Sequence, residues 1–167
     1  VDTYGGFYVG RYETTVDETE STGENIVIGS KVNNKILSTN NWYKLNLFQD
    51  SERYEKNPYY STASVKSSMI WGSQWDAMLN YILKGEDKDK VTVKTGEQKN
   101  IQSNSGQDET DKINNIYDIG SNVYEWTQEA SATNYRIYRG GSYDSTTSGR
   151  PDTRTNIIPT DPVSYTH

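Results

Sequence analysis

Polar and aromatic side chains suited to molecular recognition are concentrated between Tyr143 and Asn156. A tyrosine provides a rigid amphipathic contact at low entropic cost, and arginine, aspartate and asparagine add donors and acceptors for a polar partner. The residues expected to contact a ligand are Tyr143, Asp144, Ser145, Arg150, Asp152, Arg154 and Asn156. The competing expectation is an ordinary polar loop with turns at Pro151, Pro159 and Pro162.

Cysteine and histidine, two residue types common in nucleophilic and metal-dependent catalysis, are almost absent from the chain. There is no cysteine, which excludes disulfides, a thiolate nucleophile and thiolate metal ligands. The single histidine is His167, at the end of the printed sequence, so a Ser-His-Asp triad or a histidine-rich metal centre inside the fold is not expected. The sequence therefore predicts binding rather than enzymatic activity.

Composition favours one folded domain over residues 1–167. Hydrophobic residues make up only 32% of the chain, but 14 Tyr, 4 Trp and 2 Phe supply large buried surfaces, and the net charge is only −6. The acidic balance, without a cluster of Lys or Arg, argues against a nucleic-acid partner. No apolar stretch is long enough to predict a membrane span.

Residue periodicity predicts a small number of regular elements. Alternating apolar and polar residues over 6–14 predict a strand, and the short apolar run 25–28 predicts another within a loop. Asn41 is a plausible N-cap for an amphipathic helix over 42–54.

A second predicted helix has a clearer core-facing stripe. Ser73 and Asp76 have the spacing of a capping box, and Gly85 is expected to end the helix. The stripe consists of Trp75, Met78, Leu79, Ile82 and Leu83. Residues 86–112 are strongly polar and are expected to form a surface insertion with one hairpin.

Two motifs carry a family resemblance. They are Ile116-Tyr-Asp-Ile-Gly-Ser-Asn-Val-Tyr-Glu-Trp-Thr127 and Tyr138-Arg-Gly-Gly-Ser-Tyr143. The pair resembles the formylglycine-generating-enzyme/sulfatase-modifying family, and the segments 7–13 and 74–77 resemble its first strand and second helix. The resemblance implies an α+β, C-type-lectin-like fold, in which two helices pack on a small twisted antiparallel sheet with long irregular loops.

The chain departs from this family where catalysis takes place. Ser145 and Arg150 stand where the oxidase members carry reactive cysteines that hold copper. A degenerate enzyme is therefore the least favoured interpretation. Family members end on a Gly-Phe-Arg strand, whereas the printed chain ends at His167, so the final strand is expected to be missing.

The resemblance also implies a calcium site, because some members bind Ca²⁺ in the loop of the first motif. The matching residues are Asp118, Ser121, Val123 and Glu125. Carboxylates and carbonyl oxygens at about 2.3–2.6 Å are the ligands that Ca²⁺ prefers. The alternative is that Asp118 and Glu125 cap backbone N–H groups of the loop or pair with Arg139.

The end of the chain has an unusual composition. Residues 137–167 contain no Lys, Glu, Gln, Met or Trp, although these types make up a quarter of residues 1–136. These five are the residues that no codon ending in a pyrimidine encodes. The pattern resembles the variable proteins of diversity-generating retroelements, which randomise codons downstream of the same Arg-Gly-Gly-Ser motif.

These observations predict a non-catalytic receptor-recognition module that displays a variable polar and tyrosine-bearing surface. Its partner is expected to be a protein or glycan on another cell or particle, and an extracellular, cell-surface or phage-particle location is favoured. Lectin signatures such as Glu-Pro-Asn are absent, so no motif supports sugar binding specifically. The alternative function is a structural or interaction domain of a larger surface or phage protein.

Overall fold

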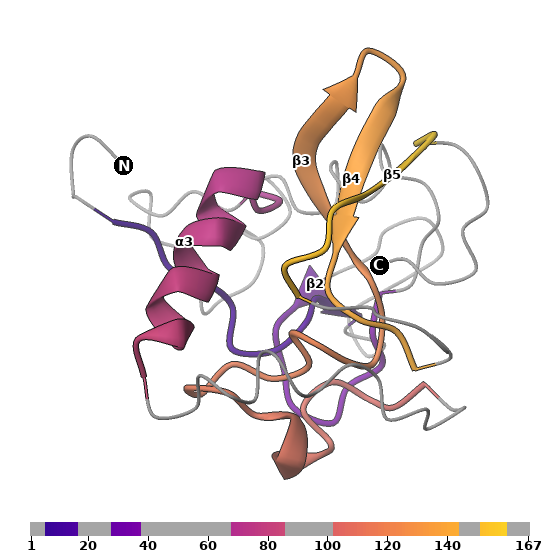
Figure 1. The fold of residues 1–167 in the computed structure, drawn as a ribbon. Helices are drawn as coiled ribbons and strands as arrows, with labels where there is room; N and C mark the ends of the chain where they lie inside the picture. Colours follow the sequence, from indigo (N-terminus) through magenta and orange to yellow (C-terminus); the bar gives the residue numbers. More distant parts are fainter. Residues whose placement is uncertain (1–5, 17–27, 38–67, 86–101, 144–150, 160–167) are drawn as a thin grey trace, which may run out of the picture.

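The computed structural model describes residues 6–16, 28–37, 68–85, 102–143 and 151–159. This part of the chain contains one α-helix and two small antiparallel sheets (Figure 1). One sheet pairs β1 (Thr15–Val16) with β2 (Ile28–Gly29), and the other has the order β3-β4-β5. The predicted α+β class is confirmed at this level. Within these ranges, no helix has the length and apolar character needed to cross a lipid bilayer.

The three-stranded sheet is a long hairpin with a short third strand. It comprises β3 (Glu125–Ala132), β4 (Tyr135–Arg139) and β5 (Thr155–Ile157). Pairing of β3 with β4 sets Glu125 opposite Arg139, which places the two sequence motifs side by side. The ribbon shows the hairpin projecting beyond α3, with β5 along its β4 side (Figure 1).

Helix α3 (Gly72–Leu83) carries most of the predicted apolar stripe into the core. Trp75, Met78, Leu79 and Ile82 are buried, whereas Leu83 in the last turn is 42% exposed. The helix ends two residues before Gly85.

The predicted capping box of α3 is wrong. The helix begins at Gly72, and the Gln74 Oε1 atom accepts the backbone N–H of Trp71 at 2.9 Å. The glutamine therefore takes the place expected for Asp76, one half-turn earlier. As a result, the Asp76 carboxylate is available for contacts outside the helix.

Two apolar clusters form the core among the described residues. The first joins the α3 stripe to Ile113 and Ile119, and the second contains Ile28, Leu37, Met69 and Trp126. Trp75 and Trp126 are each only 2% exposed, so both indoles belong to the core, as the predicted stripe requires for Trp75.

The strand predicted over residues 6–14 is wrong, because regular pairing begins only at Thr15. Phe7 and Tyr8 are both exposed and Val9 is only partly buried against the first apolar cluster, so the segment does not alternate between a buried and an exposed face. The Ser30 hydroxyl also takes both backbone groups of Tyr12, accepting its N–H at 3.2 Å and donating to its carbonyl at 2.8 Å.

Several other predicted elements lie wholly or partly outside the described residues. The helix over 42–54 lies outside the described residues, as do residues 86–101 of the stretch expected to carry a hairpin and positions 25–27 of the short apolar run. The end of the polar stretch, residues 102–112, packs against the fold instead of lying wholly in solvent. Ser105 and Gly106 are buried, and the 3₁₀ helix η1 (Glu109–Asp111) follows.

Gly140, in the second motif, adopts the positive φ that its position requires. Its φ is 84°, and a Cβ there would lie 3.1 Å from the carbonyl oxygen of Ile119. A glycine is needed because an L side chain would be both strained and crowded. Just beyond it, the Tyr143 N–H donates to the Asn122 carbonyl at 2.7 Å, which joins the ends of the two motifs.

Candidate ligand-binding site

A buried arginine lies beside the segment that the sequence singles out for ligand contact. The Arg139 side chain, from β4, is fully buried. Its Nη2 donates to Asp76 Oδ1 at 2.6 Å, its Nη1 lies 3.9 Å from Glu129 Oε2, and the guanidinium sits 5.8 Å from the Trp75 ring centroid. Because a buried charge is costly unless it is paired, this pairing is a condition of the local fold.

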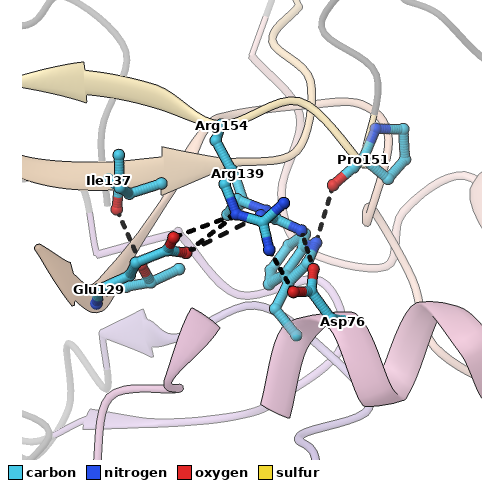
Figure 2. Close-up of polar contacts among 8 residues, drawn as sticks. Asp76, Glu129, Ile137, Arg139, Pro151 and Arg154 are labelled. Carbon is cyan, nitrogen blue, oxygen red and sulfur yellow. Dashed lines mark hydrogen bonds and ion pairs between the residues drawn. The ribbon is translucent and has the colours of Figure 1, made fainter. Parts of the chain in front are cut away.

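Arg154, just before β5, joins the same two carboxylates from the solvent side (Figure 2). Its Nε donates to Glu129 Oε1 at 3.1 Å, and its Nη2 donates to Asp76 Oδ2. Each arginine therefore contacts both carboxylates. Asp76 comes from α3, Glu129 from β3, Arg139 from β4 and Arg154 from the segment before β5. We call these four residues the ion-pair cluster.

A second contact ties the same segment to α3. The Trp75 Nε1 donates to the Pro151 carbonyl at 2.8 Å, and both groups are buried (Figure 2). Beyond Arg154, β5 pairs with β4, with Thr155 opposite Tyr138 and Ile157 opposite Arg136. The backbone of residues 151–157 is thus fixed by the helix at its start and by the sheet at its end.

The predicted contact residues are placed differently from one another. Asp152 and Asn156 are exposed, and Tyr143 is half-buried. Arg154 is 45% exposed, but its guanidinium is engaged by Asp76 and Glu129. The remaining three predicted positions, Asp144, Ser145 and Arg150, lie outside the described residues.

Sequence reasoning missed Asp76 and Glu129 as members of this site. Asp76 was assigned to a helix cap, and no role was given to Glu129. The available signal was the arginine of the Arg-Gly-Gly-Ser motif. It lies in a stretch expected to be buried, so it needed carboxylate partners from elsewhere in the chain.

The predicted calcium loop holds acidic groups in a buried environment. Asp118 is 3% exposed, and its Oδ2 accepts the Gly106 N–H at 2.8 Å. Burial, together with the nearby Asp118 charge, raises the pKa of Glu125 to about 8. Val123 is buried and Ser121 is half-buried.

Glu13 is a third acidic residue beside this loop, and sequence reasoning missed it as well. Its Oε2 accepts from Asn122 Nδ2 at 2.9 Å. Burial is the main cause that raises the pKa of Glu13 well above its usual value, and the charges of Asp118 and Glu125 add to it. We call Glu13, Asp118 and Glu125 the acidic cluster.

The described contacts of Asp118 and Arg139 bear on both alternatives to a calcium site. Asp118 accepts a backbone N–H, but that of Gly106, which lies outside the loop of the first motif. The ion pairs recorded for Arg139 are those to Asp76 and Glu129. Within the described ranges, no three or more Asp, Glu or His side chains are grouped so that they could together hold a metal ion. A cation in this loop would therefore depend on main-chain carbonyls as well as carboxylates.

Comparison of the chain with family models, with curated proteins and with solved structures found no match.

Proposed function

We propose that this chain is a non-catalytic binding module whose ligand contacts residues 151–157 and the neighbouring Tyr143. The observation that carries the proposal is a fixed backbone with exposed side chains. Residues 152, 153, 154 and 156 are exposed, although the backbone that bears them is held by Trp75 and by β4. Binding residues are characteristically placed on loops that a rigid scaffold supports.

The proposed scaffold is the C-type-lectin-like fold of the formylglycine-generating-enzyme family, in a branch resembling retroelement variable proteins. Support comes from the two family motifs, which pair directly through β3 and β4 and again through Tyr143 and Asn122. The absence of cysteine from the whole sequence supports a binding role over the family's oxidase chemistry. The proposed partner is a protein or glycan on another cell or particle.

The contact surface can be tested with an array that carries surface glycans and purified surface proteins. A variant combining Tyr143→Ala, Asp152→Ala and Asn156→Ala should lose the signals that the wild-type chain gives. The control combines Thr133→Ala, Asn134→Ala and Tyr135→Ala at the exposed hairpin tip, and it should retain them. Equal binding by the two variants would contradict the proposed surface.

Diversification of this surface has a separate genetic test. If the resemblance to retroelement proteins holds, the neighbouring DNA contains a reverse transcriptase and a near-repeat of the codons for residues 137–167. Neighbouring DNA without either feature would instead favour a structural or interaction domain of a larger protein.

We propose Ca²⁺ as a structural cofactor of the first-motif loop, held by the side chains of Asp118 and Glu125 and the carbonyls of Ser121 and Val123. The supporting observation is that desolvation and the charge of buried Asp118 raise the pKa of its half-buried acidic neighbour Glu125, and a cation would offset their repulsion. Added Ca²⁺ should raise the melting temperature, and EDTA should lower it. Identical melting curves under both conditions would contradict this proposal.

A further inference from the structure

We infer that Arg154 is a positioning residue rather than a ligand anchor, and that ligand contact in its segment falls on Asp152, Thr153 and Asn156. The assignment of contact positions rests on the proposed function. The positioning role of Arg154 does not, because it follows from contacts within the chain.

The first argument is the geometry of the guanidinium. Arg154 donates through Nε to Glu129 and through Nη2 to Asp76, so the Nε–Nη2 edge of its guanidinium is directed at carboxylates of the protein. A ligand carboxylate could pair with this edge only by competing with two carboxylates already in place. Forked pairing of this kind fixes direction as well as charge, which a lysine does not reproduce.

The second argument is the placement of the contacts along the segment. The Pro151 carbonyl is held by Trp75, Arg154 is held by the two carboxylates, and pairing with β4 begins at Thr155. Asp152 and Thr153 lie between the first two contacts, and Asn156 lies on the outer strand. Fixation at both sides leaves these three side chains exposed on a backbone with little freedom, which lowers the entropic cost of binding.

The third argument is the space kept for Glu129. A Cβ at Gly72 would lie 2.1 Å from Glu129 Oε2 and 3.0 Å from its Cβ. The glycine at the start of α3 therefore lets the Glu129 side chain lie against the helix, where it meets both arginines. A side chain at this position would displace the Glu129 carboxylate, so a glycine suits this close approach.

A displayed library tests the inference without any ligand. Codons 152, 153, 154 and 156 are randomised in the full chain, and cells are sorted for display level after a heat challenge. Arginine should be enriched over lysine at position 154, by a modest factor because its ion pairs are partly exposed, whereas positions 153 and 156 should accept most residues. Recovery of as wide a range of residues at position 154 as at position 153 would overturn the inference.

The Gly72→Ala variant provides a sharper version of the same measurement. The new methyl group displaces the Glu129 carboxylate, so the enrichment of arginine at position 154 should fall in a library built on this variant. Ser73→Ala, at an exposed neighbouring position of the same helix, is the matched control and should leave the enrichment unchanged. Unchanged enrichment in the Gly72→Ala library would count against the role of Glu129 in holding Arg154.

Panning the first library against immobilised streptavidin, and separately on a printed glycan array, tests the contact positions. Selected binders should differ at 152, 153 and 156 and keep Arg154. Binders that replace Arg154 as often as Thr153 would overturn the inference. A library that keeps Arg154 for display but yields no binder on either probe would contradict the proposed function and leave the positioning role supported.

Discussion

The ion-pair cluster and the acidic cluster both bury ionisable groups, but the free-energy cost of burying charge is offset differently in each. In the first, Arg139 and Arg154 alternate with Asp76 and Glu129, so each charge has an opposite neighbour. In the second, Glu13, Asp118 and Glu125 have the same sign, and the pKa values of both glutamates are raised. Opposite charges can join elements of the fold by themselves, whereas buried like charges require a proton or a cation.

This difference also separates the two clusters in function. The ion-pair cluster lies under residues 151–157 and fixes their backbone against α3 and β3. The acidic cluster joins the loop of the first motif, through Asp118, to the first residue of β3, Glu125, and to Glu13 in the segment before β1. Changes to the first should alter the proposed binding segment, and changes to the second should alter the response to pH and Ca²⁺.

The largest expected effect on stability comes from Trp75, whose ring packs against the guanidinium of Arg139 in the ion-pair cluster. Trp75→Ala removes a core side chain and the hydrogen bond to Pro151, so it should cost about 3–5 kcal/mol of unfolding free energy. Trp71→Ala is the matched control, because Trp71 is 51% exposed at the start of the same helix. Urea unfolding of both variants checks the difference, and similar losses would show that Trp75 has no special role.

Removal of the buried arginine should have the next largest effect. Arg139→Met leaves Asp76 with Arg154 and water, and it also removes Nε and Nη1, which have no hydrogen-bond partner. We therefore expect a loss of about 2–3 kcal/mol, below the usual cost of breaking a buried pair. Urea unfolding measures it. A variant as stable as the wild type would mean that the cluster contributes no net stability.

In the metal-free protein, the acidic cluster should make stability fall as pH rises, the opposite of the effect of a carboxylate whose pKa is lowered by folding. Because the pKa of Glu125 is about 8 in the folded state, well above its ordinary value, its contribution is present at low pH and is lost as pH rises towards 8. In EDTA, the melting temperature should fall between pH 5 and pH 8, and Glu125→Gln should reduce that slope.

Glu109 provides a control of opposite sign for this experiment. Hydrogen bonds from Lys112 and Tyr117 lower the pKa of this exposed carboxyl, so its contribution is lost as pH falls rather than as it rises. Glu109→Gln should therefore leave the decline between pH 5 and pH 8 in place. A slope that is the same in the wild type and in Glu125→Gln would contradict the account of the acidic cluster.

Arg154 should have the smallest effect on stability. Its ion pairs are partly exposed, and such pairs are worth about 0–1 kcal/mol and weaken in salt. Arg154→Gln should therefore lower unfolding free energy by less than Arg139→Met, and the difference from wild type should shrink in high salt. Thermal melts at two salt concentrations check this, and a loss equal to that of Arg139→Met would contradict it.

How far the sequence could predict these regions depends on whether the deciding interactions are local. The stripe of α3 follows from periodicity and is confirmed at Trp75, Met78, Leu79 and Ile82, whereas Leu83 is exposed. The cap of α3 lies two residues earlier than the Ser73–Asp76 spacing predicts, because Gln74 accepts the N–H of Trp71, while Asp76 pairs with Arg139, a residue 63 positions away.

Long-range contacts explain the remaining differences. Asp76 and Arg154 are 78 residues apart, and Glu13 and Asn122 are 109 apart, so no local pattern could pair them. The strand expected over 6–14 failed for the same reason, since the Ser30 hydroxyl occupies the backbone of Tyr12.

Hydrogen exchange of residues 151–157 tests most directly whether the ion-pair cluster fixes the proposed binding segment. Wild type, Arg154→Gln and the neighbouring exposed-site control Thr153→Ala are compared under native conditions. We predict faster exchange in this segment for Arg154→Gln alone, with exchange in α3 unchanged. Equal exchange in all three proteins would contradict the claim that Arg154 positions the segment.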